Sequence, residues 1–182
     1  KVTVEASFKL IETEPENPFT DISKSDYFYD AVLWAADKGI TSGVTDTLFA
    51  PNVSCTRAQM VTFLWRANGS PVVDYAMNFT DVPADAYYAD AVCWAVSKGI
   101  TSGTSATTVT RSQTVTFLYR AAGTLAVSGG SFADVDANAY YADAVAWAVA
   151  EGITSGTSAT TFSPNAPCTR AQIVTFMYRD AQ

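Results

Sequence analysis

Six arginines are the residues of this sequence best suited to hold an anion. They occur as three pairs whose members stand nine residues apart: Arg57 and Arg66, Arg111 and Arg120, and Arg170 and Arg179. Each pair falls in a segment with a helical pattern, and nine residues at about 100° each bring the two members to opposite faces of a helix. The two arginines of a pair therefore need separate explanations.

The second arginine of each pair has a structural explanation, and the first does not. The second stands near an expected helix C-terminus, where a positive charge is favoured by about 0.3 to 1 kcal/mol. The first stands at the first helical position, where the same electrostatic effect is unfavourable. A compensating anion is needed, and two sources stay open. One is an internal carboxylate of the series Asp21, Asp81 and Asp134 or of the series that begins at Asp30; the other is an anionic ligand at the helix N-terminus.

Other chemistry-bearing residue types are scarce. The sequence has no histidine, and its cysteines, Cys55, Cys93 and Cys168, are too few and too far apart for a disulfide framework or a CxxC metal site. They fit better as small buried apolar residues. The acidic residues recur with a sequence repeat, so no unique carboxylate pair of the glycosidase kind stands out. We expect no catalytic residue, no metal and no cofactor.

Composition narrows the class of partner. With 182 residues, of which 48 % are hydrophobic, the chain can bury a real core. A net charge of −7 argues against nucleic acid and anionic membranes, which need a broad basic surface. No long apolar run predicts membrane insertion. The chain starts at Lys1 rather than at Met, so we expect a processed chain or a fragment, with a possible upstream domain of the same polypeptide.

The main signal is an internal repeat. The motif D-A-V-x-W occurs at 30–34, 90–94 and 143–147, at spacings of 60 and 53 residues. Downstream, T-R-x-Q occurs at 56–59, 110–113 and 169–172, each time before an apolar helical pattern. We divide the chain into an N-terminal extended segment or linker at 1–18 and three repeats, named here repeat one (19–70), repeat two (71–124) and repeat three (125–182).

Each repeat is expected to form helix, loop and helix. The first helix should start at a polar cap, Ser25, Asp85 or Asn138, and end at Gly39, Gly99 or Gly152. The second should start at the Thr of T-x-x-Q, a capping box. A two-helix unit cannot bury its apolar faces well by itself, so we expect the three repeats to pack as one all-α domain.

The connection in repeat two is shorter than its counterparts. Thirteen residues separate Gly43 from Thr56 and Gly156 from Thr169, but only seven separate Gly103 from Thr110. The shared stretch T-S-A-T-T places the gap after Thr108, opposite residues 162–167. Because both flanks match, we expect six residues of the molecule to be absent from the sequence between Thr108 and Val109. The absent piece includes the F-x-P-N turn that repeats one and three carry at 49–52 and 162–165.

These motifs, in this order and three times over, resemble the S-layer homology family. The resemblance rests on F-T-D-V at 79–82, D-A-V-x-W-A, G-I-T-S-G, F-x-P-N and T-R-A-Q, and it covers residues 19–182. It implies a pseudo-threefold, all-helical spindle whose grooves between repeats bind a pyruvylated secondary cell-wall polysaccharide on the surface of Gram-positive bacteria. The family ends T-R-A-E where this chain has Gln59, Gln113 and Gln172, so any ligand contact made by that Glu is lost. Repeat two also has Ser112 for Ala, and its groove is expected to be the most altered.

The resemblance implies a set of ligand-binding residues. Arg57, Arg111 and Arg170 would face the anionic sugar, and the tryptophans and the G-I-T-S-G loops would form the walls: Trp34, Trp94, Trp147, Ser42, Ser102, Ser155, Gly43, Gly103 and Gly156. Alternatives stay open for several of them. The tryptophans are also expected core residues, and a tight turn explains the glycines as well as close ligand approach does.

Two functions from different classes follow. The first is non-covalent, non-enzymatic anchoring of a surface protein to the bacterial cell wall, with a guanidinium paired to a ketal-linked pyruvate carboxylate. The alternative is a protein assembly module of a surface layer, in which the arginines are internal struts.

Overall fold

The computed structural model describes residues 16–74, 79–103, 107–127 and 132–182, and these contain six helices and no strand. The first helices of the repeats are α1 (Tyr29–Asp37), α3 (Ala89–Ser97) and α5 (Ala142–Ala150). The second helices are α2 (Arg57–Ala67), α4 (Arg111–Ala121) and α6 (Arg170–Asp180). The all-α expectation is confirmed, and the extended segment expected near the N-terminus lies largely outside the described residues.

The second helices begin as expected, at three capping boxes. In α2 the Thr56 hydroxyl accepts the Gln59 amide at 3.1 Å, and the Gln59 side chain accepts the Thr56 amide at 3.0 Å. The same pair of bonds opens α4 and α6. Each box satisfies two amides that have no partner inside the helix, so the T-x-x-Q motif fixes where the helix starts.

The first helices begin later than expected, and the polar caps were the wrong signal. Each starts four residues after its expected cap, and none has a side-chain cap bond. Consecutive tight turns lead into them instead. In repeat one the Asp26 amide donates to the Ser23 carbonyl and the Tyr29 amide to the Asp26 carbonyl, both at 3.0 Å. The polar residues belong to these turns, where such side chains are equally favoured.

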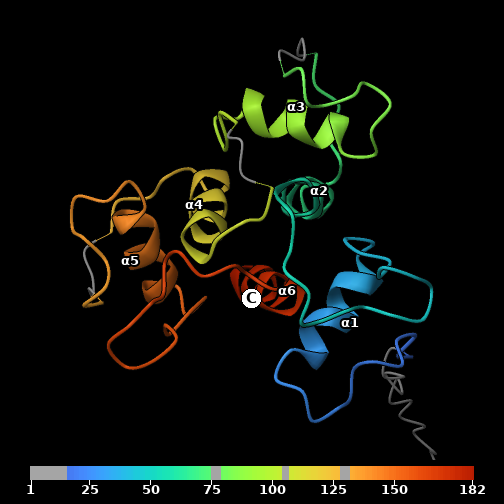
Figure 1. Cartoon of the computed structure of the whole chain (residues 1–182), viewed down its shortest axis with the longest axis horizontal. Coiled ribbons are helices and arrows are strands. Elements are labelled where there is room, and N and C mark those ends of the chain that lie inside the picture. Colours follow the sequence, from blue (N-terminus) through green and yellow to red (C-terminus); the bar gives the residue numbers. More distant parts are fainter. Residues whose placement is uncertain (1–15, 75–78, 104–106, 128–131) are drawn as a thin grey trace, which may run out of the picture.

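The six helices close into a ring. Figure 1 shows α2, α4 and α6 around the centre and α1, α3 and α5 outside them. A second helix packs against the first helix of the next repeat: α2 against α3, α4 against α5, and α6 against α1. One continuous core cluster spans all three repeats. No repeat completes its own helix pair, which explains why they form one domain.

Backbone hydrogen bonds join the three repeats at one point. The Cys55 amide donates to the Cys168 carbonyl at 2.9 Å, Cys168 to Val109 at 2.9 Å, and Val109 to Cys55 at 3.1 Å. All three side chains are fully buried. Burial raises the pKa of the Cys55 thiol to about 12 and that of Cys168 to about 11, so both stay protonated and apolar at neutral pH.

The second arginines hold the loops that follow the first helices. The guanidiniums of Arg66, Arg120 and Arg179 donate to the carbonyls of Ile40, Ile100 and Ile153 at 3.2, 2.9 and 3.0 Å. Their role is therefore structural, as expected, with a loop carbonyl as the specific partner.

Candidate ligand-binding site

The first arginine of each pair reaches out of its own repeat into the following one. In repeat three, Arg170 lies against the loop of repeat one with 2 % of its surface exposed. Its Nε donates to the Phe49 carbonyl at 2.8 Å and its Nη2 to the Thr41 hydroxyl at 3.3 Å. The guanidinium carbon lies 4.8 Å from the Phe49 ring centre and 5.4 Å from that of Phe63. Both faces and one edge of the cation are therefore occupied by the protein itself.

Arg111 repeats this arrangement between repeats two and three. Its Nε donates to the Phe162 carbonyl at 2.9 Å, and its guanidinium lies between the rings of Phe162 and Phe176. Only 4 % of its surface is exposed. This burial favours the strut alternative for Arg111 and Arg170, because a ligand would have to displace a buried phenylalanine to meet either cation.

The Asp21 series is not bonded to the arginines. The Asp21 carboxylate accepts the amides of Phe49 and Ala50 at 2.9 and 2.7 Å. Asp134 accepts those of Phe162 and Ser163 at 2.8 and 2.7 Å, and these bonds, with that of Phe162 first, lower the pKa of its carboxyl. Each carboxylate thus holds the F-x-P-N turn, and the carbonyl of that Phe serves the arginine. The internal partner of the arginine is therefore a backbone carbonyl and not the expected carboxylate. The carboxylate instead accepts the amide of the same phenylalanine.

In space, the last two residues of the short connection in repeat two, Thr107 and Thr108, match a later part of the connection in repeat three than their letters suggest. The Arg57 amide donates to the Thr107 carbonyl at 2.9 Å, as Arg111 does to Ala166 and Arg170 to Val53. Thr107 and Thr108 therefore occupy the places of Ala166 and Pro167, and Thr108 continues directly into Val109. That six residues of the molecule are absent from the sequence after Thr108 stays a prediction. The difference falls between Gly103 and Thr107, where three residues stand in place of nine.

Arg57 has fewer contacts with the described residues than Arg111 or Arg170 has. Its Nη2 donates to the Thr101 hydroxyl at 2.7 Å, and its guanidinium lies 5.0 Å from the Phe117 ring centre. Among the described residues, no second aromatic ring lies over its other face and no carbonyl accepts from its Nε. The side chain is only partly buried. Burial lowers the pKa of this guanidinium, but an arginine stays charged at any physiological pH.

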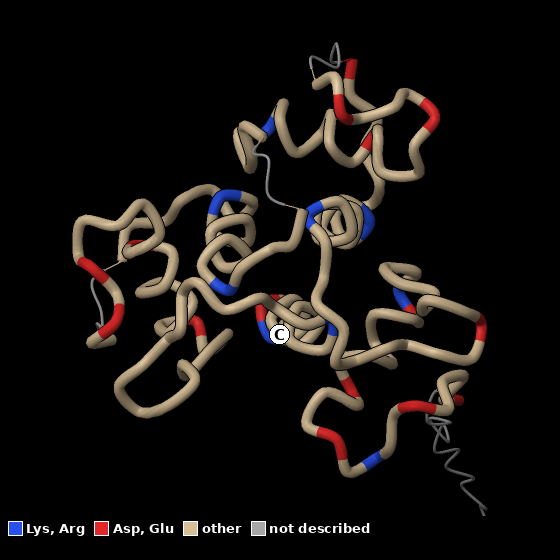
Figure 2. The backbone as a smooth tube through the Cα atoms, in the orientation of Figure 1, with Lys and Arg blue, Asp and Glu red and all other residues tan. Residues whose placement is uncertain are grey.

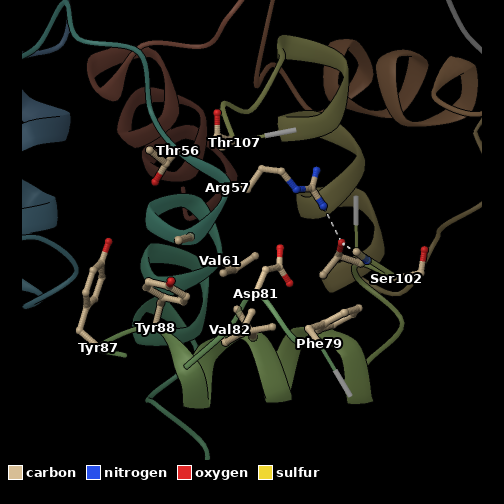
Figure 3. A pocket seen from close by; sticks show the side chains of 14 residues that line it. Thr56, Arg57, Val61, Phe79, Asp81, Val82, Tyr87, Tyr88, Ser102 and Thr107 are labelled. Carbon is tan, nitrogen blue, oxygen red and sulfur yellow. Dashed lines mark hydrogen bonds between the residues drawn. The ribbon is translucent and has the colours of Figure 1, made fainter. Parts of the chain in front are cut away.

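A pocket of about 650 Å³ opens beside this arginine. Its lining includes Phe79, Asp81, Tyr88, Thr101 and Ser102 of repeat two. Figure 3 shows the Arg57 and Asp81 side chains reaching into the same space from α2 and from the segment before α3. Asp81 is exposed and, within the described chain, accepts none of the amide bonds that Asp21 and Asp134 accept. The groove of repeat two, which was expected to be the most altered, is thus the one in which a pocket is lined by a T-R-x-Q arginine.

The predicted tryptophan walls divide into two kinds. Trp94 and Trp147 are 4 % and 2 % exposed and belong to the core, and Trp147 packs on Tyr119. Trp34 is partly exposed and packs on Tyr178 with ring centres 5.6 Å apart. None of the three lines the pocket beside Arg57.

The loop residues lie nearer to the pocket. Gly103 and Ser102 line it, and Ser42 and Ser155 are exposed at the equivalent positions. Gly43, Gly103 and Gly156 have φ of 85°, 88° and 88°. A Cβ would lie 2.5 to 2.6 Å from the ring of Phe19, Phe79 or Phe132. Phenylalanine packing and a left-handed turn thus account for these glycines.

Sequence reasoning missed Asp81, Phe79 and Thr101 as residues of this pocket. A signal was present, because the F-T-D motif recurs beside a connection that lacks its F-x-P-N turn.

The surface around the pocket is not broadly basic. In Figure 2 the arginines lie on α2, α4 and α6, while acidic residues dominate the outer loops. The part of the chain that the structure describes has no cluster of three His, Cys, Asp or Glu side chains placed to hold a metal ion. It also has no helix long and apolar enough to cross a membrane.

The relatives of the chain include a surface-layer protein, an amylopullulanase and an exoglucanase. It is 33 % identical over 168 residues to the Surface-layer 125 kDa protein of Lysinibacillus sphaericus. This match covers 85 % of the present chain and 14 % of that protein. It is 28 % identical over 177 residues to the Amylopullulanase of Thermoanaerobacterium thermosulfurigenes (91 % and 10 %) and 27 % over 172 residues to the Exoglucanase XynX of Acetivibrio thermocellus (88 % and 16 %). The chain thus spans less than a fifth of each relative.

The family model of the S-layer homology domain matches the chain three times, at residues 18–61, 78–117 and 131–174. These segments cover most of the chain, and each starts before the first helix of a repeat and ends inside its second helix. At the level of the family, the matches support attachment to the cell wall and a place at the cell surface. The chain belongs to the S-layer homology domain family, as three tandem copies closed into one ring.

Proposed function

We propose that this chain anchors a surface protein non-covalently to a bacterial cell wall by binding an anionic, pyruvylated secondary wall polysaccharide. It carries no catalysis of its own in this proposal; any enzymatic activity belongs to other parts of a longer polypeptide. The observation that supports it most is the pocket beside Arg57, whose guanidinium meets one aromatic ring and one hydroxyl among the described residues and no acceptor at Nε there.

The chemistry of the pocket fits an acidic sugar. A guanidinium edge forms two parallel hydrogen bonds with a carboxylate, and such bonds are stronger in a partly buried site than in water. Apolar lining from Phe79, Val82 and Tyr88 suits the C–H face of a sugar ring. The volume of about 650 Å³ lies within the usual range for small-ligand sites.

Binding to isolated sacculi tests the proposal. The protein should sediment with sacculi that retain their anionic polysaccharide, and it should stay in solution once that polymer or its pyruvate has been removed. Binding should weaken as ionic strength rises, because the contact is partly electrostatic. Equal binding to stripped sacculi would refute the proposal.

Arg57→Ala and Arg66→Ala form a matched pair for this assay. Both remove one positive charge from the same helix, but only Arg57 lines the pocket. Arg57→Ala should lower binding at least tenfold, whereas Arg66→Ala should bind like the parent protein.

The assembly module stays the second candidate, favoured by the burial of Arg111 and Arg170 as internal struts. It predicts that the chain associates with surface-layer subunits as well without sacculi as with them, and with little dependence on salt.

A further inference from the structure

Two of the three cysteines meet where the repeats join. Cys55 and Cys168 are 113 residues apart in the sequence, at equivalent positions just before α2 and α6. In the fold, the Cys55 amide donates to the Cys168 carbonyl at 2.9 Å, and both side chains are fully buried. The third equivalent position, before α4, is Val109. This junction therefore contains two thiols and one aliphatic side chain.

The backbone register places the two cysteines directly opposite each other. Ser54 and Thr169 form an antiparallel bridge, and Cys55 and Cys168 are the next pair along it, joined by the hydrogen bond between them. Opposite residues of an antiparallel pair project to the same face, and their Cα atoms are about 5.5 Å apart at a hydrogen-bonded position. A disulfide accepts Cα separations of about 4.4 to 6.8 Å. The backbone thus already has the spacing that a bridge between these cysteines requires.

The two repeats that carry these cysteines are the two that no peptide segment joins. The chain links repeat one to repeat two and repeat two to repeat three. In the part that the structure describes, repeats one and three meet through the packing of α6 on α1 and through hydrogen bonds such as that at the junction. A bond between Cys55 and Cys168 would make this third link covalent. Val109 lies in the repeat that is already joined to both of its neighbours.

We propose that Cys55 and Cys168 are a modification site, which a disulfide oxidant converts into a bridge that holds the ring of repeats closed. The thiolate of one cysteine attacks the disulfide of the oxidant, forms a mixed disulfide and releases one thiol. The thiolate of the other cysteine then attacks the protein sulfur of that mixed disulfide and releases the second thiol. The two protein thiols lose two electrons and two protons, and the oxidant takes them up as two thiols.

The reaction takes place on the open chain and not in the closed ring. Burial raises the pKa of both thiols in the closed ring, and only a thiolate attacks a disulfide. Both side chains are also 0 % exposed, so a small oxidant has no access to them. The bridge therefore forms during folding, before α6 packs on α1.

Refolding under two redox conditions tests this pair. The full chain is unfolded and reduced, and it is then refolded either with oxidised and reduced glutathione or with reductant alone. When the oxidised sample is unfolded again without reductant, iodoacetamide should label one cysteine per chain, Cys93, which lies in α3 outside the junction. Peptide mapping should join the segments that contain Cys55 and Cys168. Three labelled cysteines, a bridge that includes Cys93, or a disulfide-linked dimer would overturn the proposal.

Valine variants are the matched controls, because repeat two already has valine at this position. The oxidised parent chain should melt at least about 5 °C above the reduced parent, since the bridge restrains the unfolded chain over 113 residues. Cys55→Val and Cys168→Val should each melt at one temperature under both conditions, whereas Cys93→Ala should keep the difference of the parent.

Equal melting temperatures of the oxidised and reduced parent would contradict a bridge that holds the ring closed. A redox-dependent shift that persists in Cys168→Val would contradict it as well. If a valine variant fails to fold, the labelling of the parent chain decides alone, because it requires no substitution.

Discussion

The segments that connect the two helices in repeat three and in repeat two follow the same G-I-T-S-G motif but differ in length and in contacts. In repeat three, nine residues pack against Arg111, Phe132 and Asp134, and the Arg111 Nε and both Asp134 carboxylate oxygens have partners within the chain. In repeat two, three residues span the same interval, and Arg57, Phe79 and Asp81 face a pocket. Equivalent side chains therefore have different roles in the two places. They support the loop in repeat three and line a candidate ligand site in repeat two.

The difference teaches that an arginine motif does not by itself define a binding site. The three T-R-x-Q arginines have the same helix position and the same capping box. What separates them is how many described residues of the following repeat contact the guanidinium: a ring and a carbonyl of the F-x-P-N turn meet Arg111 and Arg170, and neither is present for Arg57 in the described residues. Buried polar groups that are satisfied stabilise a fold, whereas those left open favour an external partner.

The largest expected effect is that of removing a strut. Arg170→Ala should lower the free energy of unfolding by about 3 to 4 kcal/mol, because it leaves the Phe49 carbonyl without its donor and opens a cavity between two rings. For a chain of this size that corresponds to a fall of about 6 to 16 °C in melting temperature. Arg57→Ala should cost about 1 kcal/mol or less. Thermal unfolding of the two variants compares them directly, and equal losses would break the distinction between strut and site.

A smaller effect is expected at the loop glycines. Alanine at Gly156 meets the Thr161 carbonyl at 2.5 Å as well as the Phe132 ring, and backbone cannot move aside. Gly156→Ala should therefore cost about 2 to 3 kcal/mol, which includes the strain of a positive φ. At Gly103 the close described atoms all belong to the Phe79 ring, which can turn into the adjacent pocket. Gly103→Ala should cost about 1 to 2 kcal/mol in the same unfolding assay, and a larger loss there than at Gly156 would contradict the open pocket.

The smallest effect concerns the carboxylates and depends on pH. Asp134 has a lowered pKa because the amides of Phe162 and Ser163 donate to it. Its stabilisation is complete above the ordinary carboxyl pKa of about 3.9 and is lost as pH falls through the lower folded value. Asp134→Asn should therefore melt below the parent at pH 7, with the difference shrinking below about pH 4. Asp81→Asn should melt like the parent at both pH values, and a matching loss at pH 7 would show that Asp81 has a loop partner.

Most of the fold could be predicted from the sequence because the same helix-start and helix-end motifs occur in all three repeats. The capping boxes at Thr56, Thr110 and Thr169 and the glycine ends at Gly39, Gly99 and Gly152 are local, and local chemistry decides them. The starts of the first helices could not be predicted, because Ser25, Asp85 and Asn138 suit turns as well as caps. The pairing of α6 with α1 is a long-range contact that no local pattern encodes.

The candidate site could be predicted only in part. Helix position identified Arg57, Arg111 and Arg170 together, but their difference depends on a segment from the following repeat. The sequence alignment placed the shortening after Thr108, since Thr107 and Thr108 match Thr160 and Thr161 in letters. In space they take the places of Ala166 and Pro167, because the Arg57 amide needs a carbonyl partner there.

Stoichiometry tests the central claim most directly. Calorimetric titration of the whole chain with a single-repeat fragment of the wall polysaccharide should give one site per chain, and Arg57→Ala should abolish the heat signal. The Arg66→Ala variant should retain it with the same stoichiometry. Two or three sites per chain, or a titration unchanged by Arg57→Ala, would contradict the account.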